Sequence, residues 1–409
     1  MLSIPVGLLT SILLARNLGP AAFGQYAFVM SLLALLALPA AGGLPQLLTR
    51  EVAVFSQGGE WALYRGAVRA AHGWVLVVAA VVLIGYWLVG PVAGLIPQTG
   101  KWALLGIVVL LVPLQGLNAV RNGTIKGLGF PALAELPTQA IQPVLLLGSV
   151  GMLAALGTLT AANALWAQVG VAAVTIFVAS VLFYRIRPVG ASGQVLEYHN
   201  RTWLLALLPF TLISLVGTFN TQVGIVLLGT LGTDEAVAAL RVAERGAQFV
   251  GLSLALVNMV ISPYIVRAWQ EGDTERLQRL SRQSSRGAFM LALPIGAVLL
   301  VFGRPLIGFA FGEVYVEPSY PPLVILVFGQ LINVALGPVG LLLSMSGHEK
   351  LTLVSYVASL AVTLLLAIFL VPEYQQMGAA LAVTGGIVAV KVVAAFSLVR
   401  LLKIRPGIL

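Results

Sequence analysis

Residues Val75–Gly90, VLVVAAVVLIGYWLVG, form an apolar run that contains no charged side chain. Leu360–Val371, LAVTLLLAIFLV, is a second such run, and similar runs recur along the whole chain. About 20 such residues in a helix cross the ~30 Å hydrocarbon core of a bilayer. Backbone groups in lipid must bond to one another, and barrel strands would alternate in polarity over about ten residues. The continuous runs therefore predict an all-α integral membrane protein.

The composition agrees with this prediction. Hydrophobic residues make up 59% of the 409 residues, charged residues make up 9%, and the mean hydropathy is +1.00. The net charge of +9 would suit nucleic acid, but the basic residues are spread over short links, so no nucleic-acid partner is expected. The chain has no cysteine, and His72, His199 and His348 are far apart in sequence. We therefore expect no metal site and no cofactor.

The links between the apolar runs predict about twelve transmembrane helices. They are residues 1–16, 22–48, 72–96, 102–125, 132–156, 161–184, 203–230, 235–266, 287–311, 320–345, 351–371 and 377–401. Most Lys and Arg residues lie in every second link, as in loops on the cytoplasmic side. The opposite links carry only Arg16, Lys101 and Arg304. This pattern predicts a multi-pass protein of the cell (cytoplasmic or inner) membrane with both termini in the cytoplasm. The polar link 267–286 is expected to form a short amphipathic helix on the inner surface.

The two halves of the chain resemble each other. Leu18-Gly19 recurs half a chain later as Leu231-Gly232, and Gly127 recurs as Gly347. The amides Gln115 and Asn118 recur as Gln330 and Asn333 in the corresponding span. Because six spans per half bring both halves in from the same side, the repeats are parallel. We predict two parallel six-helix repeats around a central cleft: residues 1–200, which include the link between the halves, and 201–409.

The first span is short. It has about 15 apolar residues, roughly 22 Å of helix, which is less than a bilayer needs. The repeat also places the counterpart of the start of the seventh span, near Trp203, before Met1. We therefore expect that about ten native residues are missing before the first span. A signal peptide is the alternative, but a basic segment does not precede the apolar run.

Residues Leu14–Ala53, LARNLGPAAFGQYAFVMSLLALLALPAAGGLPQLLTREVA, carry a family resemblance. Arg16, Leu18-Gly19-Pro20, Phe23-Gly24, Tyr26-Ala27, Gly43-Leu44-Pro45 and Arg50 make up the pattern. The chain resembles polysaccharide-biosynthesis flippases of the Wzx-like (O-antigen or teichoic-acid) branch. Their superfamily also contains lipid II flippases and multidrug MATE exporters. This resemblance implies a flippase, not an enzyme, that moves a polyprenyl-(pyro)phosphate-linked oligosaccharide across the cytoplasmic membrane by alternating access between two lobes.

The resemblance also implies partners. These are the lipid-linked oligosaccharide and membrane lipids, with a glycan polymerase or glycosyltransferases of the same pathway as further candidates. A MATE-like cation-coupled multidrug exporter is the alternative function. Exporters of cationic drugs need carboxylates in their cleft, whereas the spans of this chain contain more cations than acids. A membrane enzyme would need an acid–base or metal constellation, and the sequence shows none.

Charged residues inside predicted spans are the first candidates for a site, because such residues are costly in lipid. Arg241, Glu244 and Arg245 share one helix face, where they form either a phosphate clamp or an Arg–Glu pair that holds two helices together. Lys391 is expected to be a cation that faces a cavity. Arg16 either adds to a cationic patch or caps the end of a helix, where the dipole favours a cation.

The remaining candidates are polar. Gln115 with Asn118, and Gln330 with Asn333, share a helix face in equivalent spans, where they either bind sugar hydroxyls or join helices. Glu135 either carries a coupling proton or pairs with Lys126 or Arg121 at the inner surface. Glu244 is the second candidate for coupling. The candidate substrate-binding residues are Arg241, Arg245, Lys391, Arg16, Gln115, Asn118, Gln330 and Asn333.

Overall fold

The computed structural model describes residues 3–92, 94, 99–188, 190, 195–402 and 406–407. Over these residues the regular structure is helical and no strand is present, so the all-α prediction is confirmed. Ten helical segments are long and apolar enough to cross a membrane. Two of these segments bend at a non-helical residue, Gly19 in one and Gln375 in the other. Division at these two residues yields the twelve predicted helices.

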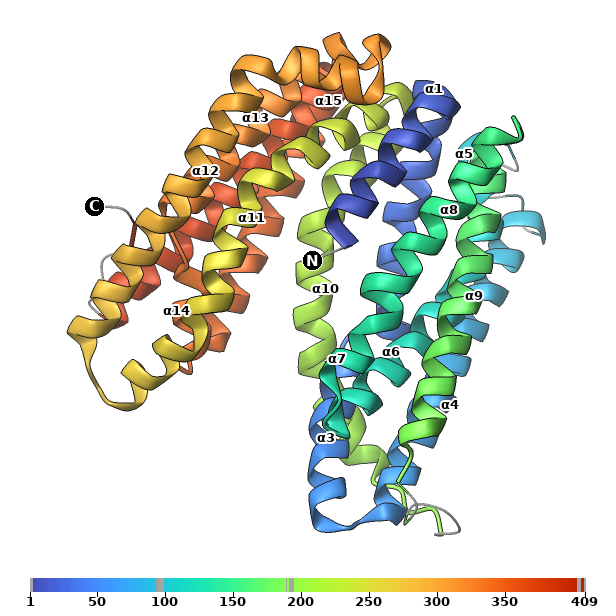
Figure 1. Cartoon of the computed structure of the whole chain (residues 1–409), viewed down its shortest axis with the longest axis vertical. Coiled ribbons are helices and arrows are strands. Elements are labelled where there is room, and N and C mark those ends of the chain that lie inside the picture. Colours follow the sequence, from blue (N-terminus) through green and yellow to red (C-terminus); the bar gives the residue numbers. More distant parts are fainter. Residues whose placement is uncertain are drawn as a thin grey trace. The chain divides into compact units, whose positions relative to one another are not determined.

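The chain divides into two units, Met1–Thr218 and Phe219–Leu409, and the boundary lies inside helix α10. Figure 1 shows the helices of the first unit in blue to green and those of the second in yellow to red. The first unit contains α1 (Ser3–Leu36), α2 (Leu38–Ala41), α3 (Leu44–Gly58), α4 (Trp61–Trp87), the π-helix η1 (Leu88–Val92), α5 (Gly100–Val108), α6 (Leu111–Gly127), α7 (Pro131–Leu136), the π-helix η2 (Pro137–Ile141), α8 (Gln142–Ala155), α9 (Ala161–Ile186) and the first part of α10 (Asn200–Leu231).

The second unit contains the rest of α10 and fewer, longer helices. They are α11 (Asp234–Gln270), α12 (Thr274–Phe311), the 3-10 helix η4 (Glu313–Tyr315), α13 (Val316–Ala335), α14 (Val339–Met345) and α15 (Glu349–Leu402). Glycine and proline account for the interruptions. Gly19 has φ 75° and precedes Pro20, and Gly337 has φ 75° and precedes Pro338. Glycine adopts positive φ without strain, and proline removes a backbone donor.

The expected amphipathic helix over residues 267–286 does not form as a separate element. Helix α11 continues to Gln270, and α12 begins at Thr274, so the segment is shared between two long helices. Asp273 caps α12, because its side chain accepts a hydrogen bond of 2.8 Å from the backbone N–H of Arg276. The helix then runs on into the apolar span, since no proline follows before Pro294.

The core of the first unit is built on close contact between α3, α4, α6 and the start of α10. Its buried residues are Leu44, Leu47, Leu48, Val52, Phe55, Tyr64, Ala67, Ala71, Val75, Ala119, Val120, Trp203 and Leu207. Helix α6 approaches α3 through glycines. A Cβ on Gly123 would lie 2.8 Å from the Cα of Pro45, and one on Gly127 would lie 2.6 Å from the Cβ of Val52. Small residues let membrane helices approach in this way.

Candidate functional site

The charged cluster of the second unit lies near the start of α11. Arg241 Nη1 donates a hydrogen bond of 3.2 Å to Glu244 Oε2, and both side chains are about one-fifth exposed. The positive charge of Arg245 also acts on the Glu244 carboxylate. The Arg241–Glu244 pair therefore lies within one helix and does not connect two helices. A role for Arg241 and Arg245 as a phosphate clamp stays a prediction.

Lys391 has a backbone partner. Its Nζ donates a hydrogen bond of 2.7 Å to the carbonyl oxygen of Gly337, in the break between α13 and α14. Gly337 packs so closely on α12 that a Cβ there would lie 1.9 Å from Ser285 Oγ. An ammonium group has three N–H donors. One of them satisfies a carbonyl left free by the break, and two are left for other acceptors.

The two amide pairs differ in their contacts. In the second unit, Asn333 Nδ2 donates a hydrogen bond of 3.0 Å to Gln330 Oε1. Gln330 Oε1 also faces α11, since a Cβ on Gly251 would lie 2.9 Å from it. In the first unit, neither Gln115 nor Asn118 has a side-chain hydrogen bond to any other residue that the structure describes, and both are partly exposed on α6.

Glu135 pairs with Lys126, as one of the two alternatives expected. Lys126 Nζ lies 2.5 Å from Glu135 Oε1, and Asn122 Nδ2 donates a longer bond of 3.5 Å to the same oxygen. Arg121 turns to α9 instead, where its guanidinium lies 4.6 Å from the ring centroid of Phe183. The coupling role of Glu135 remains a prediction.

Arg16 is exposed and lies three residues before Gly19, at the end of the first part of α1. This is the position that the helix dipole favours for a cation, so the capping alternative fits its place. A role for Arg16 in a cationic patch stays a prediction.

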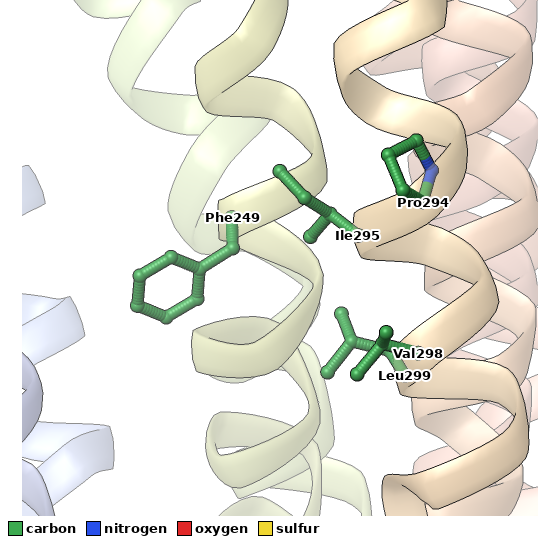
Figure 2. A pocket seen from close by; sticks show the side chains of 5 residues that line it. All are labelled: Phe249, Pro294, Ile295, Val298 and Leu299. Atoms are coloured by element: carbon green, nitrogen blue, oxygen red, sulfur yellow. The ribbon is translucent and has the colours of Figure 1, made fainter.

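Two hollows were not expected from the sequence. In the second unit, a hollow of about 440 Å³ lies between α11 and α12. Figure 2 shows its lining, in which Phe249 comes from α11 and Pro294, Ile295, Val298 and Leu299 come from α12. All of these side chains are apolar.

The other hollow is a groove of about 300 Å³ in the first unit, which we name the α3–α4–α10 groove. It is lined by Leu44, Leu47, Leu48, Glu51, Ala67, Ala70, Ala71, Trp74, Val77, Tyr198, Asn200, Trp203, Leu204 and Leu207. The groove forms where small residues of α4 lie opposite large residues of α3 and α10. The sequence contains these residues, but it does not show that the three helices pack together.

A comparison with known families identifies the family of this chain. Residues 13–319 match the family described as "Polysaccharide biosynthesis protein". The chain belongs to this polysaccharide biosynthesis protein family. The resemblance inferred from Leu14–Ala53 is thus confirmed, although no curated protein matches the chain.

Solved structures show which fold the family member adopts. An inward-facing multidrug resistance MATE transporter of the MOP superfamily is similar with a TM-score of 0.80 at 16% identity, over 98% of this chain and 95% of that one. The inward closed lipid II flippase MurJ is similar with a TM-score of 0.75 at 14% identity, over 97% and 85%. A MOP superfamily transporter from Pyrococcus furiosus, described as having a binding pocket of reverse polarity, has a TM-score of 0.64 at 17% identity, over 98% and 93%.

These likenesses establish the fold of this polysaccharide biosynthesis protein as the two-lobed MATE and MurJ type. Together with its apolar helices, they make it a multi-pass membrane protein. The predicted fold class and family are therefore confirmed. The predicted site residues lie on several helices of both units. Most of them contact other residues of the protein.

Proposed function

We propose that this protein is a flippase that translocates a polyprenyl-(pyro)phosphate-linked oligosaccharide across the cytoplasmic membrane, by alternating access between its two lobes. The observation that carries the proposal is the family match over residues 13–319, on a fold shared with a lipid II flippase. The proposal assigns transport and no catalytic residue. Both termini are placed in the cytoplasm, because the links on that side hold most of the basic residues.

The cargo sets three physical requirements. Its sugar and phosphates are polar or charged, and unpaired groups of this kind pay a large cost in hydrocarbon. Its polyprenyl chain is apolar and stays in lipid. The carrier must therefore offer donors for phosphate, neutral donors and acceptors for hydroxyl groups, and an open side for the chain.

Cations at membrane depth meet the first requirement. Arg241 bonds to Glu244, and the positive charge of Arg245 acts on the same carboxylate, so two guanidinium groups flank one acid on this face of α11. Lys391 adds a cation, with two donors beyond the one that it gives to Gly337. Charge-assisted hydrogen bonds from such donors are the strong ones for phosphate oxygens.

Amides meet the second requirement. Gln115 and Asn118 are partly exposed on α6, and among the described residues they leave all their donors and acceptors unused. The Gln330–Asn333 pair already bonds internally and packs on α11. We therefore assign sugar contact to Gln115 and Asn118, and mainly helix joining to Gln330 and Asn333.

A MATE-like multidrug exporter is the second candidate. Its supporting observation is the TM-score of 0.80 with a MATE transporter, which concerns the fold. The charge of the membrane-level residues argues for an anionic cargo instead. A glycan polymerase and glycosyltransferases of the same pathway are the partners proposed, because they would consume or supply the cargo.

Reconstitution into lipid vesicles tests the proposal. A lipid-linked oligosaccharide carrying a fluorescent sugar is placed in the inner leaflet, and its appearance outside is measured by a quencher that does not cross the membrane. We expect the purified protein to speed this appearance, and we expect Arg241→Ala to slow it while still reaching the membrane. Transport of an organic dye cation, with no movement of the lipid-linked oligosaccharide, would favour the exporter instead.

A further inference from the structure

We propose that the α3–α4–α10 groove binds the polyprenyl chain of the cargo while its phosphate and sugar lie at the inner membrane surface. This inference rests on the proposed function and adds to it a binding site for the lipid part of the cargo. None of the residues that line the groove belongs to the candidate sites predicted from the sequence.

The walls of the groove are preformed. Trp203 and Leu207 of α10 are each only 6% exposed and belong to the core. Trp74 is held in place, because its Nε1 donates a hydrogen bond of 2.8 Å to the carbonyl oxygen of Pro39. Between these large side chains, Ala70 and Ala71 of α4 occupy little volume, and this leaves the hollow. A rigid groove loses little entropy when a chain binds.

The lining changes from polar to apolar in the same direction on α3 and α10. On α3, Glu51 lies seven residues before the end at Gly58, and Leu44 lies about 10 Å deeper by helical rise. On α10, Asn200 is the first residue, and Leu207 again lies about 10 Å deeper.

Helix α4 starts at Trp61, and its groove residues extend from Ala67 at a depth of about 9 Å to Val77 at about 24 Å. The ends of α3 and α10 that hold Glu51 and Asn200, and the start of α4, are those assigned to the cytoplasm. The groove thus begins at the level of the inner head groups and ends near the middle of the bilayer. The chain of a lipid whose head lies at the inner surface covers the same range of depth.

The groove is open along one side. Val77 is 61% exposed, Leu204 is 51% exposed and Tyr198 is 44% exposed, although two of these side chains are purely apolar. A polyprenyl chain is longer than the groove, so its far end must leave sideways into the bilayer. The open side permits this.

An exposed arginine beside the mouth of the groove offers N–H donors to a phosphate head. Arg50 pairs with Glu51 through two donors, Nη2 at 2.7 Å and Nε at 3.0 Å, so the one acid in the lining is neutralised. The Arg50 side chain is still 52% exposed, and its guanidinium also lies 5.6 Å from the ring centroid of Phe210. The hollow between α11 and α12 has no polar end, which is why the assignment goes to the α3–α4–α10 groove.

The mouth also touches the link between the halves. Glu197 N donates a bond of 3.4 Å to the carbonyl oxygen of Ala62, and a Cβ on Gly66 would clash with the carbonyl oxygen of Glu197. Tyr198, at the mouth, follows directly. A chain in the groove therefore contacts the segment that joins the sixth and seventh helices. This contact favours the cargo over an ordinary phospholipid as the occupant, because cargo binding has to act on both halves during transport.

Filling the groove tests the proposal. We compare Ala70→Trp, which projects into the groove, with Ala80→Trp, a matched change at an exposed position of the same helix outside it. Each variant is given the same glycan pyrophosphate on a full-length polyprenyl chain or on a single isoprene unit, which is too short to reach Ala70. We expect Ala70→Trp to slow flipping of the long-chain cargo about tenfold, the effect of losing the burial of roughly two methylene groups. Its rate with the short-chain cargo, and both rates of Ala80→Trp, should equal those of the unchanged protein.

Equal rates for Ala70→Trp and the unchanged protein, or an equal loss on both cargoes, would overturn the groove assignment. A protein that flips neither cargo would instead count against the proposed function, and a second measurement then decides about the groove. A photoreactive benzophenone side chain replaces Leu204, which lines the groove, or Leu205, which is 63% exposed and does not line it.

The vesicles for this measurement contain phosphatidylglycerol and a small fraction of polyprenyl phosphate. We expect polyprenyl phosphate to crosslink at position 204 well above its share of the lipid, and only in proportion to its share at position 205. Crosslinks to phosphatidylglycerol alone at position 204 would make the groove an ordinary lipid-facing surface and overturn the proposal.

Discussion

Equivalent helices of the two repeats follow different paths. In the first unit, α6 runs without interruption through Gln115 and Asn118 to Gly127. In the second unit, α13 ends two residues after Asn333, and α14 begins only at Val339. The local reason is Gly337-Pro338, since the corresponding stretch of α6 contains no proline.

The two repeats therefore stabilise these equivalent helices in different ways. The continuous α6 uses Gly123 and Gly127 to pack against α3. The broken helix exposes a carbonyl at Gly337, and Lys391 of α15 supplies the donor for it. The first repeat thus joins this helix to its neighbour by close packing, whereas the second also needs a charged side chain that bonds to an irregular segment. Irregular backbone at membrane depth is tolerated only with such compensation.

The largest effect is expected at the break itself. Gly337→Ala places a methyl group at positive φ, 1.9 Å from Ser285 Oγ, so both strain and overlap oppose it. We expect the free energy of unfolding to fall by about 2 kcal/mol or more. Thermal unfolding in detergent measures this change. Gly340→Ala, in helical α14 with open space around it, is the matched control and should not destabilise the protein. Equal stability of both variants would mean that the break does not constrain Gly337.

The next effect is expected at Lys391. Lys391→Met keeps most of the side-chain length and removes the donor, which leaves the Gly337 carbonyl without its partner. An unsatisfied buried acceptor costs about 1–3 kcal/mol, so unfolding should become easier by that amount and export should fall. Lys391→Arg restores a donor and a charge. Surface glycan in a host that depends on this protein reports export, and normal glycan with Lys391→Met would remove the cation from the proposed transport path.

The two amide pairs are expected to differ in what they contribute to stability and to flipping. Gln330→Ala removes an amide that bonds to Asn333 and packs on α11, and we expect a loss of stability of about 0.6–2 kcal/mol. Gln115→Ala removes an amide without such bonds, so stability should be unchanged while the flipping rate falls. Flipping assays and thermal unfolding on both variants check this. The reverse outcome, a stability loss for Gln115→Ala alone, would contradict the assignment of sugar contact to Gln115.

The smallest effect on stability is expected for the ion pair at the end of α6. The Lys126 and Glu135 side chains are 29% and 39% exposed, so solvent screens their attraction. Lys126→Met should therefore cost no more than a few tenths of a kcal/mol. Glu135→Gln separates this pairing role from coupling, because it removes the charge at constant volume. If Glu135→Gln stops flipping in vesicles at an unchanged unfolding temperature, Glu135 is a coupling residue. If flipping is unchanged, Glu135 has the pairing role alone.

Hydropathy and charge alone determined the helical class and the number of spans, because the bilayer imposes length and apolarity on every helix separately. Recurring residues such as Leu18-Gly19 and Leu231-Gly232 indicated the repeat. The breaks at Gly19 and near Gln375 also followed, since they lie in the predicted links 17–21 and 372–376. The segment 267–286 was predicted wrongly as a separate helix, because its polarity says nothing about whether a helix continues through it.

Contacts between helices were decided only by the tertiary structure. The bond from Lys391 to Gly337 joins residues 54 positions apart, and the α3–α4–α10 groove combines three elements. Periodicity shows which face of a helix is apolar, but it does not show which partner covers that face or where small and large side chains meet. Packing geometry therefore determined which cation bonds to the broken helix and where the α3–α4–α10 groove lies.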